Sequence, residues 1–502
     1  MPRDFRCFTR ALTTWADCAT RPAMPSWLSN MLPIVVLLTA VGVVLWRLPK
    51  VDLGHSQAFK RRRIFNWLPL GLTYAFLYFA RYNFKAMGTE LETTGLLTKM
   101  QFGDIEGVGA ITYGLAFLLN GPLTDRWGGR VTILLAAGGS AIANLCMGFL
   151  FWKASDGVIE KDAMIRWLTL INAVNMYFQS FGAVSIVKVN APWFHLRERG
   201  VLGGLFGILI SLGLYFAFDW SKAIRAVAPL QWVFWIPAAT LLVFFVLDLF
   251  VIKDSPGHAG HPDFDTGDAT DNDPGPPSLV RITKRMFSHP VIWIIISVEF
   301  CSGYLRQAVM TWGPNYAKSI GQSSHFVFSN WGLVSCVAGI LGGVFAGFIS
   351  DAVFGSRRGP VAAVLYGGLF GGACVAYFAI GSPVVGWSVA FMSLCVIGVH
   401  GMLSGTASMD FGGKKGAGIA TGIIDGFVYL GSASQSFIFG RLLPKDAAAK
   451  DPANWSVWPM AMIPIAVLGF FLATRVWNAR PRSTAPTPSP APAPPGLVET
   501  AR

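Results

Sequence analysis

The sequence predicts an all-α integral membrane protein whose helices form two bundles of six. Of its 502 residues, 53% are hydrophobic and only 13% are charged, whereas about a quarter of the residues are charged in a typical soluble domain. Twelve apolar stretches of about 20 residues, the length that crosses a bilayer core, fall into two sets. Arg81 and Arg306 hold matching places in these sets, and Asp125 and Asp351 follow them at nearly equal distances. This pattern indicates an internal duplication.

Each bundle is predicted from its own run of apolar stretches. The first six stretches span 66–87, 104–122, 131–152, 166–191, 200–220 and 232–251, within a bundle at 60–252. The second six span 290–312, 327–349, 360–381, 384–409, 416–438 and 456–477, within a bundle at 290–477. Residues 253–289 between them are rich in aspartate, glycine and proline. A segment of this composition cannot bury a core, so we expect a solvated linker.

Two terminal regions lie outside the bundles. The extension 1–59 contains a further apolar run at 27–46. It starts too late for a cleaved signal peptide and has no small-residue cleavage site after it, so we expect an extra transmembrane anchor; a start codon assigned too early is the alternative. The tail 478–502 is rich in proline and alanine, and we expect it to be disordered.

The distribution of lysine and arginine predicts the orientation in the membrane. The formal net charge is +13, and the basic residues gather in alternate loops, in the linker and after the last helix. Positively charged loops face the cytoplasm, which places the linker and the C-terminus there, in a cytoplasmic (inner) membrane. The bilayer is thus the expected macromolecular partner, and nucleic acid is not.

The first apolar stretch carries a polar face. Tyr74, Tyr78 and Arg81 are spaced i, i+4 and i+7, so they share one side of a helix. A lone arginine at mid-bilayer costs about 2.5–3.5 kcal/mol, so two buried arginines indicate a polar cavity and an anionic cargo. Arg306 shares a helix face with Glu299, which we expect to offset its charge. An interfacial arginine reaching toward water is the alternative for Arg81, but it does not explain the matching Arg306.

A glycine-rich charged loop joins the second and third predicted helices. Its sequence, Gly-Pro-Leu-Thr-Asp-Arg-Trp-Gly-Gly-Arg at 121–130, resembles the signature loop of the major facilitator superfamily, and a shorter copy surrounds Asp351. The resemblance implies two bundles that rock about a midplane cavity, with this loop latching the cytoplasmic side. The alternative is a simple turn with ordinary cytoplasmic charges. The gating residues implied are Gly121, Asp125, Arg126, Gly128, Arg130 and Asp351.

Further motifs resemble the organophosphate:phosphate antiporters within that superfamily. They are Tyr-x-x-x-Tyr-x-x-Arg-x-Asn-Phe at 74–84, Arg-Glu-Arg-Gly at 197–200, Asp-Ser-Pro at 254–256, Tyr-Leu-Arg at 304–306, Trp-x-Pro-x-Tyr at 312–316, Lys-Lys-x-x-Gly at 414–418 and Tyr-Leu-Gly at 429–431. The resemblance implies a monomeric carrier that exchanges a small phosphate ester for inorganic phosphate by alternating access. It implies that Arg81 and Arg306 grip the phosphate and that Tyr74, Tyr78, Tyr113 and Tyr429 line the cavity.

The chain departs from this family at positions that would recognise the organic part of the cargo. Pro192, Phe117 and Ile424 stand at places where glycerol-phosphate or hexose-phosphate carriers have a histidine or lysine. The cargo therefore stays open among glycerol phosphate, sugar phosphate and phosphoglycerate. Asp425 is suited to a sugar hydroxyl, a proton, a salt bridge between helices or a local kink. His400 is suited to packing or to proton relay.

The sequence contains no pattern of an enzyme or a metal site. It lacks HExxH, paired CxxC, GxGxxG and Walker motifs, so we expect neither a catalytic activity nor a cofactor. Its seven cysteines are scattered, without metal-ligand spacing. Two alternatives to exchange remain: a transporter-like sensor of sugar phosphates, and a carrier of non-phosphorylated organic anions or sugars coupled to protons through Glu299, Asp425 or His400.

Overall fold

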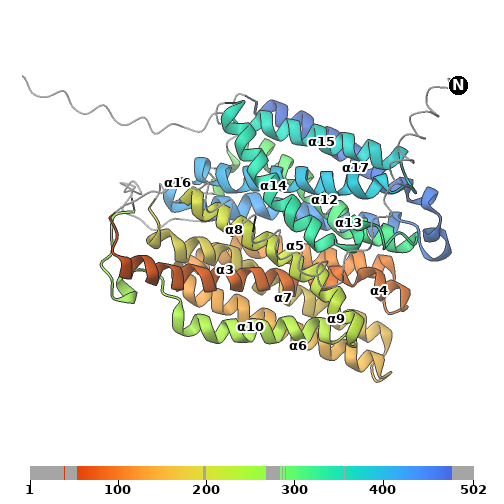
Figure 1. Ribbon diagram of the computed structural model, residues 1–502, viewed down its shortest axis with the longest axis horizontal. Coiled ribbons are helices and arrows are strands. Elements are labelled where there is room, and N and C mark those ends of the chain that lie inside the picture. The colour runs from red at the N-terminus through yellow and green to blue at the C-terminus, as the bar shows by residue number, and fades with distance from the viewer. Residues whose placement is uncertain are drawn as a thin grey trace, which may run out of the picture. The chain divides into compact units, whose positions relative to one another are not determined.

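The computed structural model describes residues 54–195, 199–266, 283–284, 286–288, 290–354 and 357–477, together with Thr39 (Figure 1). Within these ranges, the side chains of 199–206, 347–348, 351–352, 358 and 402–421 are not described. Apart from Thr39, the predicted apolar segment 27–46 lies outside the described residues, as do residues 267–282, 285 and 289 of the predicted linker and the tail 478–502. Every regular element in the described part is helical.

The first bundle contains six long helical segments. They are α3 (Gln57–Ala86), α5 (Lys99–Trp127), α6 (Gly129–Ser155), α7 (Lys161–Asn190), α8 (Arg199–Tyr215) continued by η3 (Phe216–Trp220) and α9 (Ser221–Val227), and α10 (Trp232–Val251). A short helix, α4 (Gly88–Thr93), follows α3. Hereafter the "α4 end" is the end of the bundles at this helix, and the "linker end" is the end where the chain leaves α10.

Helix α3 begins nine residues earlier than its apolar stretch, because polar contacts extend it. The Ser56 hydroxyl caps it by accepting a hydrogen bond from Phe59 N at 3.2 Å. Arg62 donates to Val251 O at 2.7 Å, and Asn66 Nδ2 donates to Lys253 O at 3.1 Å. The basic start of α3 thus satisfies carbonyl groups at the C-terminus of α10, where positive charge is favourable.

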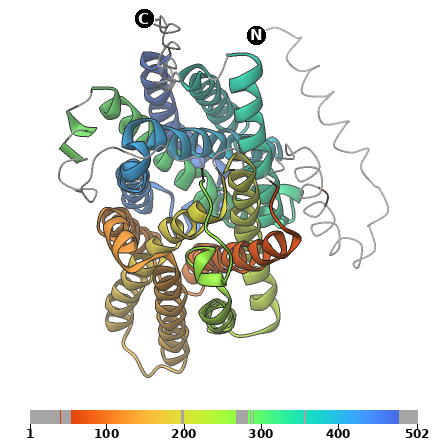
Figure 2. The same ribbon diagram turned by 90° about the vertical axis from the view of Figure 1, so that its left-hand side faces the viewer.

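The second bundle repeats this organisation. Its elements are α12 (Pro290–Ser319), α13 (Phe326–Ser329), α14 (Trp331–Ala352), α15 (Arg358–Phe378), α16 (Val384–Leu442) and α17 (Val457–Arg475). Viewed along the helices, the elements coloured red to yellow-green group together, and those coloured green to blue lie beside them (Figure 2).

Helix α16 covers both the tenth and the eleventh predicted stretches, so the loop expected between 409 and 416 is helical. Both ends of α16 nevertheless lie at the α4 end. Just before it, Gly381 lies against Pro452, and just after it, Pro444 O accepts a hydrogen bond from Lys99, whose ammonium lies 4.8 Å from the Trp455 ring. The two described arms, 384–401 and 422–442, are therefore antiparallel and serve as two membrane-crossing segments.

The helices have the apolar surface of a membrane protein. Among the described residues, nine helices are long and apolar enough to cross a bilayer. In α10 only 33% of the most apolar window is buried, and large side chains such as Phe250 and Val243 face outward. With little polar surface outside, the backbone groups are satisfied within the helices, as a hydrocarbon environment requires. The predicted all-α, two-bundle membrane fold is confirmed.

The two bundles touch mainly along two pairs of helices. Helix α5 packs along the second arm of α16, and α8 packs against α14. Glycines permit the close approach: a Cβ at Gly103 would lie 2.5 Å from Ser436 O, and one at Gly114 would lie 2.9 Å from Gly426 O. Because the backbones of helices from the two bundles come into contact at these glycines, the side chains that lie between the bundles are enclosed.

Candidate anion-binding site

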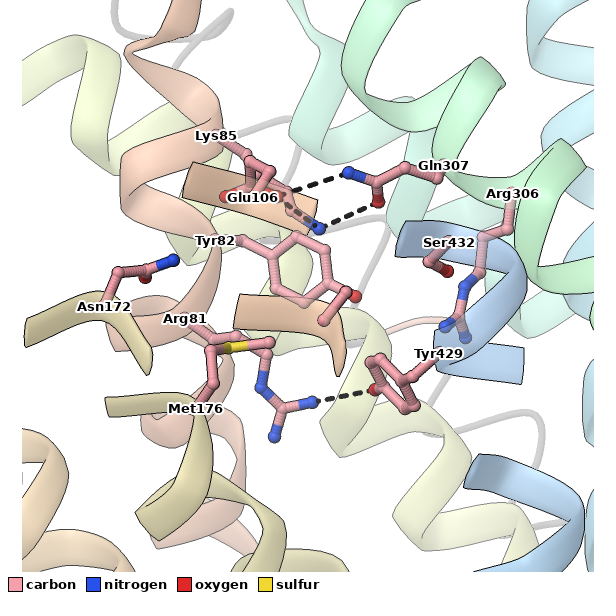
Figure 3. Close-up of a pocket in the computed structure, with 11 residues that line it drawn as sticks. Arg81, Tyr82, Lys85, Glu106, Asn172, Met176, Arg306, Gln307, Tyr429 and Ser432 are labelled. Carbon is pink, nitrogen blue, oxygen red and sulfur yellow. Dashed lines mark hydrogen bonds and ion pairs between the residues drawn. The ribbon is translucent and has the colours of Figure 1, made fainter. Parts of the chain in front are cut away.

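A small cavity lies between the bundles, midway along the helices. Its volume is about 10 Å³, roughly the space that one water molecule needs. The bundles are thus closed around it. The lining side chains come from α3, α5, α7, α12 and α16 and are Arg81, Tyr82, Lys85, Glu106, Ala110, Asn172, Met176, Arg306, Gln307, Tyr429 and Ser432 (Figure 3).

Arg81 is buried and held on every side. Its Nε and Nη2 atoms donate to Gln179 Oε1 at 3.2 and 3.1 Å, and Gln179 is itself fixed by donating to Leu77 O at 2.9 Å. The guanidinium lies 4.5 Å from the ring centroids of both Tyr78 and Tyr113, a distance at which the ring faces attract a cation. The charge is therefore stabilised without a carboxylate.

Arg306 is positioned differently. Among the described residues, none forms a hydrogen bond or ion pair with its guanidinium, and its nitrogens are not among the enclosed unpaired atoms. Its nearest aromatic partner is the Tyr429 ring, whose centroid lies 5.5 Å away. A guanidinium carries five N–H donors in a planar fork that matches phosphate or carboxylate. These N–H groups lie at the cavity and are available to donate hydrogen bonds to a ligand (Figure 3).

Tyr429 connects the two arginines. Its hydroxyl accepts a hydrogen bond from Arg81 Nη1 at 3.2 Å, and its ring lies beside Arg306. Since Arg81 belongs to the first bundle and Tyr429 to the second, this hydrogen bond crosses between the bundles. An anion bound to both arginines would likewise connect the first bundle to the second.

The other tyrosines named from the sequence surround Arg81. Tyr74 and Tyr78 are 5.3 Å apart between ring centroids, and Tyr113 lies 4.1 Å from Tyr429. The structure thus brings Arg81, Arg306, Tyr78, Tyr113 and Tyr429 together. In this conformation only Tyr429 of the four tyrosines forms part of the cavity wall.

Glu299, His400 and Asp425, which the sequence suggested for specificity or proton coupling, lie outside the cavity wall. Glu299 is fully buried, and its Oε2 lies 3.3 Å from His400 Nδ1. In the described part of the chain its partner is this histidine, and no ion pair joins it to Arg306. Asp425 is half-buried on α16, four residues before Tyr429. None of the three lines the cavity.

The charged loop between α5 and α6 is tied to its own bundle. Gly128 separates the helices with φ 86° and ψ 155°, a region that only glycine adopts readily. Asp254 Oδ1 accepts a hydrogen bond from Arg130 N at 2.8 Å, while Asp125 pairs with Lys188 at 2.7 Å. Gly121 lies inside α5 and Arg126 in its last turn. The Asp351 side chain lies outside the described residues.

Sequence reasoning missed several polar residues of the site, and four of them show why. Gln179 holds Arg81, while Lys85, Glu106 and Gln307 lie at one side of the cavity. Two had a local signal, because Lys85 follows Arg81 by one helical turn and Gln307 adjoins Arg306. The other two lie on α5 and α7, and only packing against α3 reveals them.

Comparison with known proteins agrees with this architecture. The model of the Major Facilitator Superfamily matches residues 70–435. A solved bacterial homolog of the human lysosomal transporter Spinster, in an inward-facing and unoccupied conformation, superposes with a TM-score of 0.65. At 14% identity, over 84% of this chain and 98% of that one, it supports the fold alone.

Curated relatives are more specific. The chain is 25% identical to the glycerol-3-phosphate transporter of Bacillus subtilis, over 86% of this chain and 96% of that protein. It is 25% identical to the membrane sensor protein UhpC of Salmonella typhimurium, over 78% and 88%. It is 23% identical to a probable hexose phosphate transport protein of Chlamydia trachomatis, over 84% and 92%. The predicted resemblance to the organophosphate:phosphate antiporters is confirmed by these relatives, and the chain belongs to the major facilitator superfamily of multi-pass membrane transporters.

Proposed function

We propose that this protein exchanges a phosphorylated small metabolite for inorganic phosphate across a cytoplasmic membrane, as a monomer, with its linker and C-terminus in the cytoplasm. The observation that carries the proposal is the pair of arginines at one cavity, with Arg306 free of hydrogen bonds and ion pairs to the described residues. The names of the relatives, which include carriers of glycerol 3-phosphate and hexose phosphate, support a phosphate ester as cargo.

The two arginines supply a reason for exchange. At an effective dielectric constant of 20, a unit charge attracts an opposite charge 4 Å away by about 4 kcal/mol. A phosphate dianion between Arg81 and Arg306 therefore stabilises the conformation in which the bundles close around it. The empty carrier brings two cations together without an anion, so its reorientation is slow. A ligand shifts such an equilibrium by its differential affinity for the two states.

Transport assays with purified protein in liposomes test this proposal. Labelled phosphate should enter liposomes loaded with phosphate and fail to enter empty ones. Equal uptake into both would contradict exchange.

Replacing Arg306 by lysine should lower exchange about tenfold or more, because an ammonium keeps the charge and loses the planar fork. The matched control is Arg166→Lys on the exposed start of α7, which should transport normally. Normal exchange by Arg306→Lys would remove the paired hydrogen bonds from the mechanism.

A sensor is the second candidate, because one relative is named as a membrane sensor protein. A sensor would bind phosphate esters through the same arginines and show no flux. Binding to purified protein, measured by calorimetry beside the liposome assay, separates the two functions. Binding without counterflow favours the sensor.

A further inference from the structure

Three polar side chains at one side of the cavity form a closed hydrogen-bonded group. Lys85 Nζ lies 3.0 Å from Glu106 Oε2 and donates to Gln307 Oε1 at 2.8 Å. Gln307 Nε2 donates to Glu106 Oε2 at 3.2 Å (Figure 3). The three residues come from α3, α5 and α12, and all are buried or nearly so. The positive charge of Lys85 is therefore already balanced, and the group adds no free cation to the cavity.

The same group leaves hydrogen-bond acceptors open. Both interactions of Glu106 use Oε2, no described residue donates to Oε1, and Oε1 is not among the enclosed unpaired atoms. Asn172, on α7, also has an oxygen that accepts no hydrogen bond from the described residues. Its Nδ2 donates to Ile105 O at 3.2 Å, while its Oδ1 has no donor among the described residues and is likewise not enclosed. Glu106 and Asn172 both line the cavity.

The cavity thus has one part lined by hydrogen-bond donors and another part lined by acceptors. Around Arg81 and Arg306 it presents N–H donors and positive charge, which suit the oxygens of a phosphate group. Around Glu106 and Asn172 it presents acceptors, one of them a carboxylate. Hydroxyl groups donate to such acceptors, whereas a second carboxylate placed there has no hydrogen to donate and would leave the oxygens of Glu106 and Asn172 unpaired.

We propose that Glu106, held by Lys85 and Gln307, acts with Asn172 to select phosphate esters whose organic part carries free hydroxyl groups and no further negative charge. Glycerol phosphate and sugar phosphates belong to this class, and phosphorylated carboxylic acids are excluded from it. This inference rests on the proposed function, because it assumes that the phosphate group binds at the two arginines.

Exchange of labelled phosphate against internal phosphate, challenged with unlabelled esters, tests the selection. Glycerol 3-phosphate or glucose 6-phosphate should inhibit wild-type exchange at concentrations at least tenfold below those of 3-phosphoglycerate and phosphoenolpyruvate. The Glu106→Gln variant should reduce or invert this ratio, because it leaves the ammonium of Lys85 without its counter-ion and free to attract a carboxylate. The ratio compares esters within one variant, so a change in the variant's own exchange rate does not alter it. The matched control, Glu160→Gln at the exposed start of α7, should keep the wild-type ratio.

Two outcomes would overturn the selection while leaving the proposed function intact. One is equal or stronger inhibition by the carboxylated esters in the wild type, and the other is an unchanged ratio in Glu106→Gln. If that variant fails to fold, Asn172→Ala replaces it and should weaken inhibition by the hydroxylated esters several-fold relative to inhibition by the carboxylated esters. Absence of any wild-type phosphate exchange would contradict the proposed function instead, and calorimetric binding of the same four esters would then decide the selectivity.

Discussion

Arg81 and Arg306 occupy matching positions in the two bundles and differ in what surrounds them. Gln179 and two tyrosine rings hold Arg81, whereas Arg306 has no described hydrogen-bond partner. A fixed guanidinium is preorganised for an anion, and an open one supplies unused donors. In a phosphate site built from this pair, Arg81 would supply a rigid guanidinium and Arg306 would supply unused N–H donors. Tyr429 contacts both arginines.

Replacing Tyr429 by phenylalanine should weaken the apparent affinity for phosphate about fivefold. The variant keeps the ring beside Arg306 and deletes the hydroxyl that accepts from Arg81, a hydrogen bond whose loss costs about 1 kcal/mol. The measurement is the concentration dependence of phosphate exchange in liposomes. Tyr177→Phe is the control, since the Tyr177 hydroxyl has no partner among the described residues. Equal affinities in Tyr429→Phe and the wild type would show that the hydroxyl does not contribute.

Local spacing determined which of these residues could be predicted. Tyr74, Tyr78 and Arg81 could be placed on one face because the helical period is set within a single segment. Gln179 and Glu106 could not, because their roles depend on how α7 and α5 pack against α3, which no spacing in one sequence specifies. Likewise, the partner of Glu299 is on another helix, at His400, although Arg306 shares a helix face with Glu299.

The turn between α5 and α6 depends on a single glycine. Gly128 caps α5 and starts α6 at positive φ, and a Cβ there would lie 2.8 Å from Asp254 Oδ2. The other oxygen of that carboxylate accepts from Arg130 N in the first turn of α6, where negative charge is favourable. One residue thus sets the angle between two helices and ties both to the end of α10.

Gly128→Ala should destabilise the protein by at least about 2 kcal/mol, since it adds backbone strain and displaces Asp254. Thermal denaturation in detergent, followed by size-exclusion chromatography, measures the effect. Gly157→Ala is the matched control, because Gly157 also has a positive φ, 70°, but has open space where a Cβ would lie. The control separates strain from collision: equal losses in the two variants would mean that the contact with Asp254 contributes nothing.

The helices themselves were largely predictable from apolar stretches, because bilayer thickness fixes their minimum length. The boundaries differ where polar contacts act. Helix α3 starts early because Ser56 and Arg62 find partners, and helix persists through the loop expected within α16. Both features arise from interactions that hydropathy does not measure.

At the scale of the whole molecule, the bundles are joined more tightly at one end than at the other. Among the described residues, polar contacts between bundles lie around the cavity or at the α4 end. There Asp104 pairs with Arg441, and Lys222 donates to Ser329 O. At the linker end, the Asp125–Lys188 pair stays within the first bundle. In the proposed orientation this conformation is closed toward the outside, and alternating access requires the contacts at the α4 end to break.

Asp219 makes the contact best suited to test that closure. Its two carboxylate oxygens accept hydrogen bonds from Gly332 N at 2.9 Å and Leu333 N at 3.0 Å, so a side chain of the first bundle caps α14 of the second. Hydrogen bonds to a charged group contribute about 1.5–3 kcal/mol. Asp219→Asn retains the size of the side chain, loses its charge and offers only one oxygen to the two amides.

Asp219→Asn should therefore shift the equilibrium about tenfold or more toward the conformation open at the α4 end, since about 1.4 kcal/mol corresponds to a factor of ten. Hydrogen–deuterium exchange measures it directly: uptake should rise in the first turn of α14 and at 99–107 and 436–444, and stay unchanged at 128–132. Asp156→Asn is the control, because the side chain of this exposed residue at the same end pairs, within the described part of the chain, only with Lys153 at 4.0 Å. Unchanged uptake in α14 would mean that Asp219 does not hold the bundles together.

Added phosphate should lower the raised deuterium uptake of Asp219→Asn. An anion between Arg81 and Arg306 favours the closed state from the cavity, while Asp219 favours it from the α4 end.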